Sequence, residues 1–177
     1  MRRGSRLFHL DIYMKNGISV IFLDIDGVLN KQCALPTSNT IKVKGGRLDS
    51  GCLDAFQSLL DTTGAKVVIS STWRSKNIPY GELLDGSGLQ VDIIGETPLL
   101  GRHCFRGNEI WAWVDENVDV LGVSSPHNFH QYLILDDSSD ILYWQKNNFY
   151  RTEGDAGLTG VGAYRAARQL KSFVNLV

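Results

Sequence analysis

The feature that most constrains this chain is an apolar run that leads directly into two acids. In the stretch VIFLDIDGVLN, residues 20–30, four apolar residues precede Asp24, and Asp26 and Gly27 follow closely. An apolar run of this length, bounded by turn-forming residues, is typical of a strand buried on both faces of a sheet. Ionised carboxylates at the end of a buried strand are costly unless something compensates their charge. The fold must therefore supply that compensation.

The rest of the chain alternates apolar runs with helical patterns. This alternation predicts βα units, and hence an α/β fold with a central parallel sheet flanked by helices. The predicted strands are 19–24, 66–70, 91–94 and 131–136. The predicted helices are 49–62, a segment around 108–118, and 157–173, in which Thr159 is the expected N-cap.

One connection shows neither pattern. Residues 30–47 contain no convincing helix or strand periodicity, and structureless loops of this length inside compact domains are usually functional or disordered. The segment has no acid and four basic residues, Lys31, Lys42, Lys44 and Arg47. Such a segment is most often a solvated loop, but its place directly after the two acids makes it a candidate for contact with a ligand.

Composition restricts the class of protein. The chain has 177 residues, of which 43% are hydrophobic, and a net charge of −1, which excludes a globally basic nucleic-acid binder but not a local basic patch. Cys33, Cys52 and Cys104 show no CxxC spacing, so we expect no disulfide framework, no zinc site and a reducing, cytoplasmic location. No apolar run approaches the roughly 20 residues that span a bilayer. We expect residues 1–17 to be a loosely ordered extension of one domain, 18–177.

Polar residues follow three of the predicted strands. Adjacent parallel strands bring their carboxyl ends to one edge of the sheet, where ligands bind, so Asp24, Asp26, Ser70 and Asp137 should lie together. Carboxylates 4 Å apart repel one another by about 4 kcal/mol at an effective dielectric of 20. A hard cation removes that cost, and a set of oxygen ligands selects Mg²⁺ over zinc. The sequence therefore predicts a Mg²⁺ site that a phosphate completes.

The two leading acids also suit a reaction. Alternating side-chain directions put Asp24 and Asp26 on the same side of an extended chain, and Gly27 then lets the backbone turn away. An aspartate can attack phosphorus to form an aspartyl-phosphate, which splits one hard step into two. A second acid can protonate the leaving oxygen and later activate water.

This arrangement resembles the haloacid dehalogenase (HAD) superfamily of phosphohydrolases. The matching segments are FLDIDGVLN, VVISS and LILDDSSD, in the order of the superfamily's first, second and fourth motifs. More narrowly, VVISSTWR, RGNEIWAW, YLILDDSSD and the late GLT resemble the HAD domain of Swiss Army Knife RNA repair proteins. The resemblance extends over about residues 18–170, and it implies a Rossmann-like HAD fold with a minimal cap domain or none.

The resemblance also implies roles for the residues of the first two motifs. Asp24 would be the nucleophile and a Mg²⁺ ligand. Asp26 would be the general acid and base, and would offer its backbone carbonyl to the metal. Ser70 would hydrogen-bond the transferring phosphoryl group, with Ser71 as the alternative if the strand ends later.

The remaining motifs are assigned in the same way. Asp137 would bind Mg²⁺ directly, and Asp136 would act through water or a neighbouring ligand. The superfamily's third motif normally supplies a lysine, and this sequence departs from that pattern. Arg106 is the candidate for the missing cation, and Arg102 is the alternative.

Four more residues are candidates for substrate binding. Lys42 and Lys44 belong to the basic segment after the nucleophile, and Trp73 and Arg74 follow the second motif. Trp73 would either stack on a terminal base or pack in the core. Arg74 would either bind substrate phosphate or pair with an acid.

The expected function is a Mg²⁺-dependent phosphomonoester hydrolase that acts through an aspartyl-phosphate on RNA or DNA ends, or on nucleotides. One alternative is a phosphatase of small metabolites. Another is a phosphoacceptor switch, although such switches place their acceptor on the third strand rather than the first. Asp26 disfavours a dehalogenase or phosphonatase, and the short span after Asn30 disfavours a phosphomutase with a large cap.

Overall fold

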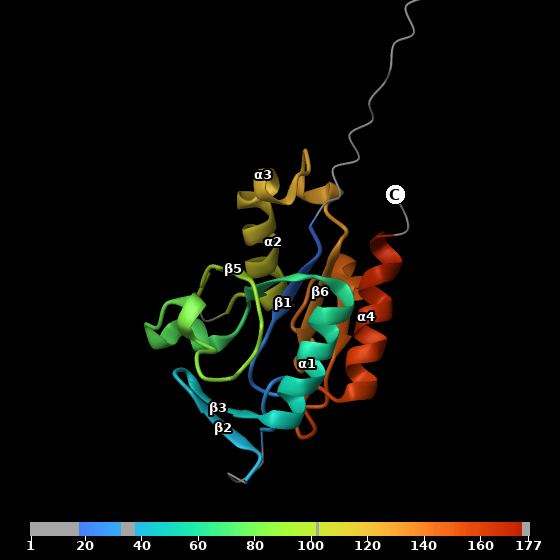
Figure 1. The fold of residues 1–177 in the computed structure, drawn as a ribbon. Coiled ribbons are helices and arrows are strands. Elements are labelled where there is room, and N and C mark those ends of the chain that lie inside the picture. Colours follow the sequence, from blue (N-terminus) through green and yellow to red (C-terminus); the bar gives the residue numbers. More distant parts are fainter. Residues whose placement is uncertain (1–17, 33–37, 102, 175–177) are drawn as a thin grey trace, which may run out of the picture.

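The computed structural model describes residues 18–32, 38–101 and 103–174, so the expectations for residues 1–17 and for Cys33 and Arg102 lie outside the described residues. Its centre is a five-stranded parallel sheet in the order β5-β4-β1-β6-β7, with helices on both faces (Figure 1). The strands are β1 (Val20–Leu23), β4 (Lys66–Ile69), β5 (Ile93–Glu96), β6 (Tyr132–Asp136) and β7 (Phe149–Arg151). The predicted α/β, Rossmann-like architecture is confirmed.

The central strand β1 has a different partner on each face. Ile21 and Leu23 belong to the core that packs under α1 (Ser50–Thr63) and α4 (Gly160–Val174), whereas Val20 and Phe22 belong to the core under α2 (Arg106–Glu116). All four side chains are fully buried, and burying each one contributes roughly 1.5–3 kcal/mol. Because side chains alternate along a strand, the next residue in the Val20–Phe22 series is Asp24, on the α2 face.

The predicted helices are confirmed with small shifts in their ends. Asp49 caps α1 by accepting a hydrogen bond from the Cys52 backbone N–H (3.2 Å), and Gly64 ends the helix in the left-handed region. Thr159 accepts from the Gly162 N–H (3.1 Å) ahead of α4, as an N-cap does. The remaining helical segments are α3 (Val118–Leu121), η1 (Thr72–Lys76), η2 (Tyr80–Glu82), η3 (Pro126–Asn128) and η4 (Tyr143–Asn148). None of the helices in the described residues has the length and apolar character required to span a membrane.

The expectation that residues 30–47 lack secondary structure was wrong. Strands β2 (Thr40–Val43) and β3 (Gly46–Asp49) form an antiparallel hairpin of their own, separate from the main sheet (Figure 1). The signal was present in the sequence, because two glycines between short alternating runs are a hairpin pattern. The strands are only four residues long, too short for the periodicity to stand out. In the described residues this hairpin is all that lies between Gln32 and α1, so the expectation of a minimal cap holds.

Two strands also differ from the prediction. β5 begins at Ile93 rather than at residue 91, because its pairing with β4 starts where the Val67 N–H donates to the Asp92 carbonyl (2.9 Å). β7 was not predicted at all, since a three-residue strand offers no periodic pattern. It pairs with β6 up to Asp136 and so extends the sheet next to that acid.

Candidate active site

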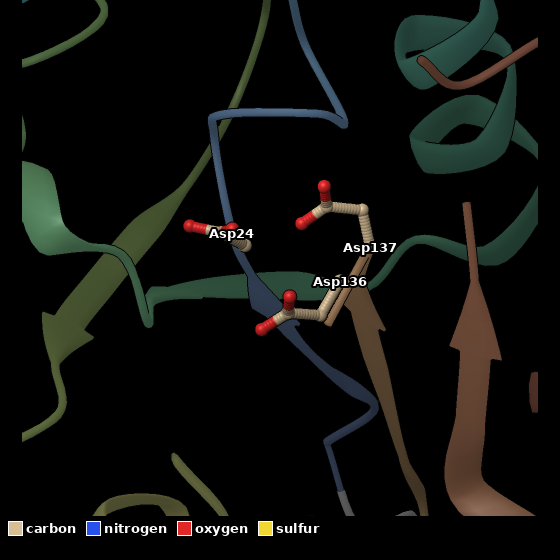
Figure 2. Close-up of side chains that lie close together, drawn as sticks. All are labelled: Asp24, Asp136 and Asp137. Carbon is tan, nitrogen blue, oxygen red and sulfur yellow. The ribbon is translucent and has the colours of Figure 1, made fainter. Parts of the chain in front are cut away.

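Three acids meet at the carboxyl ends of β1 and β6. The register pairs Phe22 with Ile134, and the Asp24 N–H donates to the Leu135 carbonyl (2.9 Å), so Asp24 and Asp136 follow side by side on the α2 face. One carboxylate oxygen from each of Asp24, Asp136 and Asp137 lies within 4.8 Å of the others (Figure 2). These oxygen ligands could hold a hard cation. Of the four residues expected together at this edge, Asp24 and Asp137 do meet there, with Asp136 beside them, whereas Asp26 and Ser70 do not belong to the cluster.

Burial makes this cluster electrostatically unfavourable without a counter-charge. Asp24 and Asp136 are 7% and 2% exposed. Desolvation raises the pKa of Asp24 above its usual value, while hydrogen bonding to Ser71 and the charge of Arg106 oppose the rise. Desolvation, together with the charge of Asp24, raises the pKa of Asp136 to about 7. Burial and mutual repulsion therefore disfavour the ionised forms of Asp24 and Asp136, and a cation bound among the acids would favour them.

Gly27 makes room for the third acid of the cluster. Its φ of +76° lies in the left-handed region, and a Cβ added there would come within 2.4 Å of the Asp137 carboxylate. The Thr152 hydroxyl donates to the Gly27 carbonyl (2.8 Å), and the Gln32 amide donates to Asp137. Sequence reasoning identified Gly27 but missed Thr152 and Gln32, because Thr152 is 125 residues from Gly27 and Gln32 is 105 residues from Asp137, and only the folded structure brings these pairs together.

Arg106 is the cation at this cluster. Its guanidinium lies 3.5 Å from Asp136 Oδ2 and 4.0 Å from Asp24 Oδ1. It is the first residue of α2, and its side chain is 13% exposed. The structure thus places the positive charge of Arg106 beside the acids, and its equivalence to the superfamily's lysine stays a prediction. The alternative, Arg102, lies outside the described residues.

The start of α2 is held so that Arg106 reaches the acids. The backbone N–H of Arg106 donates to Asp140 Oδ2 (3.2 Å), and that of Gly107 donates to the Asp140 carbonyl (3.0 Å). A Cβ on Gly107 would meet the Leu142 backbone nitrogen at 2.4 Å, so only glycine allows the helix to approach this closely. Glu109, one turn further, lies 3.9 Å from the Arg106 guanidinium. The motif residue Asp140 therefore acts by fixing α2.

The second motif contributes Ser71 rather than Ser70 to the cluster. The Ser71 hydroxyl hydrogen-bonds the Asp24 carboxylate and lowers its pKa. Ser70 instead lies with its hydroxyl 3.4 Å from the Thr97 hydroxyl. β4 ends at Ile69, and Ser71 is the extended N-cap of η1, which turns its side chain toward Asp24. The geometry therefore favours the alternative, Ser71, as the serine at Asp24, and contact of either serine with a phosphoryl group stays a prediction.

Asp26 stands apart from the three clustered acids. Its carboxylate accepts from Trp73 Nε1 (2.9 Å) at one oxygen and from Asn30 Nδ2 (2.7 Å) at the other. Asn30 also accepts from the Gly27 N–H (2.9 Å), so it fixes the turn after β1 and the acid together. Both partners hold the Asp26 carboxylate in one orientation, as a proton-transferring group requires.

Trp73 is not a platform for a base. The residue is only 3% exposed, and Cβ atoms on Gly45 and Gly46 would clash with its ring at 2.4 and 2.8 Å. The Lys76 ammonium lies 3.6 Å from the ring centroid. Stacking on a terminal base is therefore ruled out, and the indole instead positions Asp26.

The prediction that Arg74 binds substrate phosphate was wrong. The alternative prediction, that Arg74 pairs with an acid, is confirmed. Its guanidinium is buried, with Nη2 2.8 Å from Glu109 and Nη1 donating to the Thr97 carbonyl and hydroxyl (2.5 and 2.6 Å) and to the Pro98 carbonyl (2.9 Å). Nε donates to the Ser71 carbonyl (2.6 Å). Every nitrogen of the group is engaged, so Arg74 supports Glu109 and the motif-two turn.

Removing the Arg74 charge should destabilise the protein rather than weaken substrate binding. Arg74→Met removes the closest cation of buried Glu109 and leaves it only the Arg106 guanidinium at 3.9 Å, which we expect to cost about 3 kcal/mol. Urea unfolding followed by tryptophan fluorescence measures this loss. The double variant Arg74→Met/Glu109→Leu should recover much of it, because no unpaired charge is left behind. A raised KM at unchanged stability would contradict the structural role.

Lys42 and Lys44 lie on the hairpin. Lys42 is exposed on β2, and Lys44 follows the strand and forms an ion pair with Glu82. Neither contacts the three clustered acids in the structure. Both line a hollow that Asp26 also lines. Contact between this segment and a ligand stays a prediction, and this hollow is where we expect the contact.

The raised pKa values predict how stability depends on pH without metal. A carboxyl whose folded pKa is about 7, against 3.8 in the unfolded chain, stabilises the fold fully below pH 4, and this stabilisation is lost as pH rises to 7. The free energy of unfolding should fall by a few kcal/mol over this range. For a chain of this size, each kcal/mol lowers Tm by about 2–4 °C. Mg²⁺ should therefore raise Tm more at pH 8 than at pH 5.

Thermal melts across pH, with Mg²⁺ and with a chelator, test this expectation. Asp136→Asn is the informative variant, since it removes the titrating group while keeping its size. We expect the variant to melt higher than the parent at pH 8 in chelator and to lose most of the Mg²⁺ shift. The same melting curves for parent and variant at every pH would show that Asp136 does not carry the effect.

A parallel sheet with a DxD pair after its first strand, an acidic pair after β6 and a cation from α2 defines a HAD-type phosphohydrolase fold and site. The comparison with family models agrees: residues 20–162 match the family described as the HAD domain in Swiss Army Knife RNA repair proteins. The chain belongs to this family, as the sequence motifs predicted, and membership implies hydrolase activity of the phosphatase type. No curated protein and no solved structure matches the chain.

Proposed function

We propose that this protein is a Mg²⁺-dependent phosphomonoesterase that removes terminal phosphate from nucleic-acid ends through an aspartyl-phosphate at Asp24. The observation that carries the proposal is the convergence of Asp24, Asp136 and Asp137 beside Arg106. The family supports the substrate class, because its description refers to RNA repair proteins.

The donor set fits Mg²⁺. Three carboxylate oxygens lie within 4.8 Å of one another, and in the part of the chain that the structure describes no sulfur or imidazole ligand joins them. Gly27 leaves the space that Asp137 occupies. Asp24, Asp136 and Asp137 would hold the ion, together with the backbone carbonyl of Asp26. When bound, Mg²⁺ neutralises the carboxylates and polarises the phosphoryl oxygens.

The residues of the chain then divide the chemistry in two. In the first step an Asp24 carboxylate oxygen attacks phosphorus, the bond from phosphorus to the leaving oxygen breaks, and Asp26 donates a proton to that oxygen. In the second step Asp26 takes a proton from water, the water oxygen attacks phosphorus, and the bond to Asp24 breaks. Arg106 and the Ser71 hydroxyl lie where they would hydrogen-bond the transferring phosphoryl group, in which negative charge is concentrated.

The shape of the site supports a polymer end as the substrate. In the described residues only the β2–β3 hairpin follows the nucleophile before α1, so no large cap encloses the site. Enclosure selects small molecules, whereas an open sheet edge can accept the terminus of a chain. The exposed basic residues of the hairpin are suited to a polyanion.

A phosphate-release screen with Mg²⁺ tests the proposal. The substrates are small phosphate esters, nucleotides, and oligonucleotides phosphorylated at the 3′ or the 5′ end. We expect oligonucleotides to be hydrolysed with the highest kcat/KM, and their advantage to shrink as salt rises. Equal kcat/KM on oligonucleotides and mononucleotides at low salt would favour a small-metabolite phosphatase. Stoichiometric phosphorylation that persists without turnover would indicate a phosphoacceptor switch.

A further inference from the structure

A hollow of about 520 Å³ opens between the β2–β3 hairpin and η1, and Asp26 forms part of its wall. Its lining is mainly polar and backbone, with Val43 and the edge of Trp73 as the apolar side chains. The charged side chains of the lining are Asp26 and four cations, Lys42, Lys44, Arg47 and Lys76. Cations therefore dominate the space next to the acid that protonates the leaving group.

Two of these cations lie directly opposite one another. Lys42 and Arg47 are paired across the β2–β3 ladder, and both are exposed. Like charges at directly opposite positions destabilise an antiparallel pair. No described residue forms an ion pair with Lys42 or Arg47. An anion bound between them would convert this repulsion into attraction.

The other two cations are held at the rim. Lys44 pairs with Glu82, and Lys76 donates to the Gly45 carbonyl (2.7 Å) while its ammonium lies over the Trp73 ring. Even with Asp26 and Glu82 counted as ionised, cations outnumber carboxylates around the hollow. The local field therefore favours an anion, although the whole chain has a net charge of −1.

We infer that this hollow binds a second, non-reacting phosphate group that belongs to the leaving group of the substrate. The inference rests on the proposed function, in which Asp26 protonates the leaving oxygen. A group attached to that oxygen must extend past Asp26, and this hollow is a space that Asp26 borders. The lining selects an anionic leaving group, such as a nucleotide whose next linkage is a phosphodiester, over a neutral alcohol.

Removing a single charge from the substrate tests the inference. With Mg²⁺, kcat/KM is measured on a phosphorylated dinucleotide and on the same molecule with a methylphosphonate, which is neutral, in place of its diester. We expect the diester to be preferred about tenfold or more, as for loss of a charge-assisted contact. A nucleoside bisphosphate then identifies which kind of phosphate the hollow binds. If its kcat/KM equals that of the dinucleotide, the hollow accepts any second phosphate. If its kcat/KM is lower, the hollow is specific for the diester.

The protein side of the contact is tested by Lys42→Ala/Arg47→Ala, for which the ratio of the two kcat/KM values should fall close to one. The matched control, Arg168→Ala/Lys171→Ala, removes the same two charges from exposed positions on α4 and should keep the ratio of the parent. The hairpin variant should also melt no lower than the parent at low salt, since a repulsive pair is removed.

Equal kcat/KM on the diester and the methylphosphonate with the parent protein would overturn the inference and leave the proposed function standing. Failure to release phosphate from any substrate would instead refute the proposed function. In that case, anisotropy of dye-labelled dinucleotides without Mg²⁺ decides the inference by itself. Weaker binding of the methylphosphonate supports a phosphate site in the hollow, and equal binding overturns it.

Discussion

Asp24→Asn should fold normally and lose about three orders of magnitude or more in kcat/KM. An amide attacks phosphorus poorly and contributes no charge to a cation, so both functions of the residue disappear at once. The substitution keeps the size of the side chain and removes a carboxyl whose pKa is raised by burial, so stability without metal should not fall. Phosphate release and thermal melting, measured on the same preparation, separate the two effects.

A matched control makes the result specific to the site. Asp115→Asn changes the charge by the same amount at an exposed position of α2 and should keep the activity of the parent. Turnover within tenfold of the parent in Asp24→Asn would remove Asp24 from the role of nucleophile.

The second large effect is expected at Arg106. Arg106→Met should lower kcat by about two to three orders of magnitude, because it removes the cation that lies 4.0 Å from Asp24 and would stabilise charge on the phosphoryl group. Arg106 also lowers the pKa of Asp24 and of Asp136. Since Asp24 attacks only when ionised, loss of Arg106 should move the acidic limb of the pH profile of kcat/KM to higher pH.

Conservative and distant substitutions complete this test. Arg106→Lys should recover much of the activity, because it restores a positive charge of the kind that the superfamily's third motif supplies. Arg165→Met, at an exposed position of α4, removes an equal charge and should have no effect on the pH profile. The expected loss of kcat in Arg106→Met with an unshifted pH profile would contradict the predicted influence of Arg106 on the pKa of Asp24.

The parts of the site that sequence could predict are those fixed by strand geometry. Strand ends predicted that Asp24 and Asp137 meet at one edge, as they do, and the resemblance added Asp136; the same reasoning placed Asp26 and Ser70 with them, which the structure does not. Arg106 was predicted from its place between the second and fourth motifs, although the superfamily usually has a lysine in its third motif. Periodicity also predicted four of the five strands of the sheet and the three main helices, with errors of a few residues at their ends, whereas it missed β7.

The parts that sequence could not predict depend on how side chains pack. Ser70 and Ser71 are neighbours, and which one reaches Asp24 depends on where β4 ends and how η1 turns. From their place after the second motif, Trp73 and Arg74 were candidates for contact with substrate. In the structure both are buried, and they hydrogen-bond Asp26 and Glu109 respectively. A buried polar group needs a partner, and the sequence does not say which partner will be near.

The most direct test of the central claim is a rapid acid quench of the reaction with a substrate radiolabelled in its phosphoryl group. Asp26→Asn with an aryl phosphate is the combination of choice. The aryl leaving group departs without a proton from Asp26, while loss of the base that activates water should make the phosphorylated enzyme accumulate. The account predicts label on the peptide that contains Asp24, released by hydroxylamine as expected for an acyl phosphate. Phosphate release without label on the protein, accompanied by inversion of configuration at phosphorus, would contradict it.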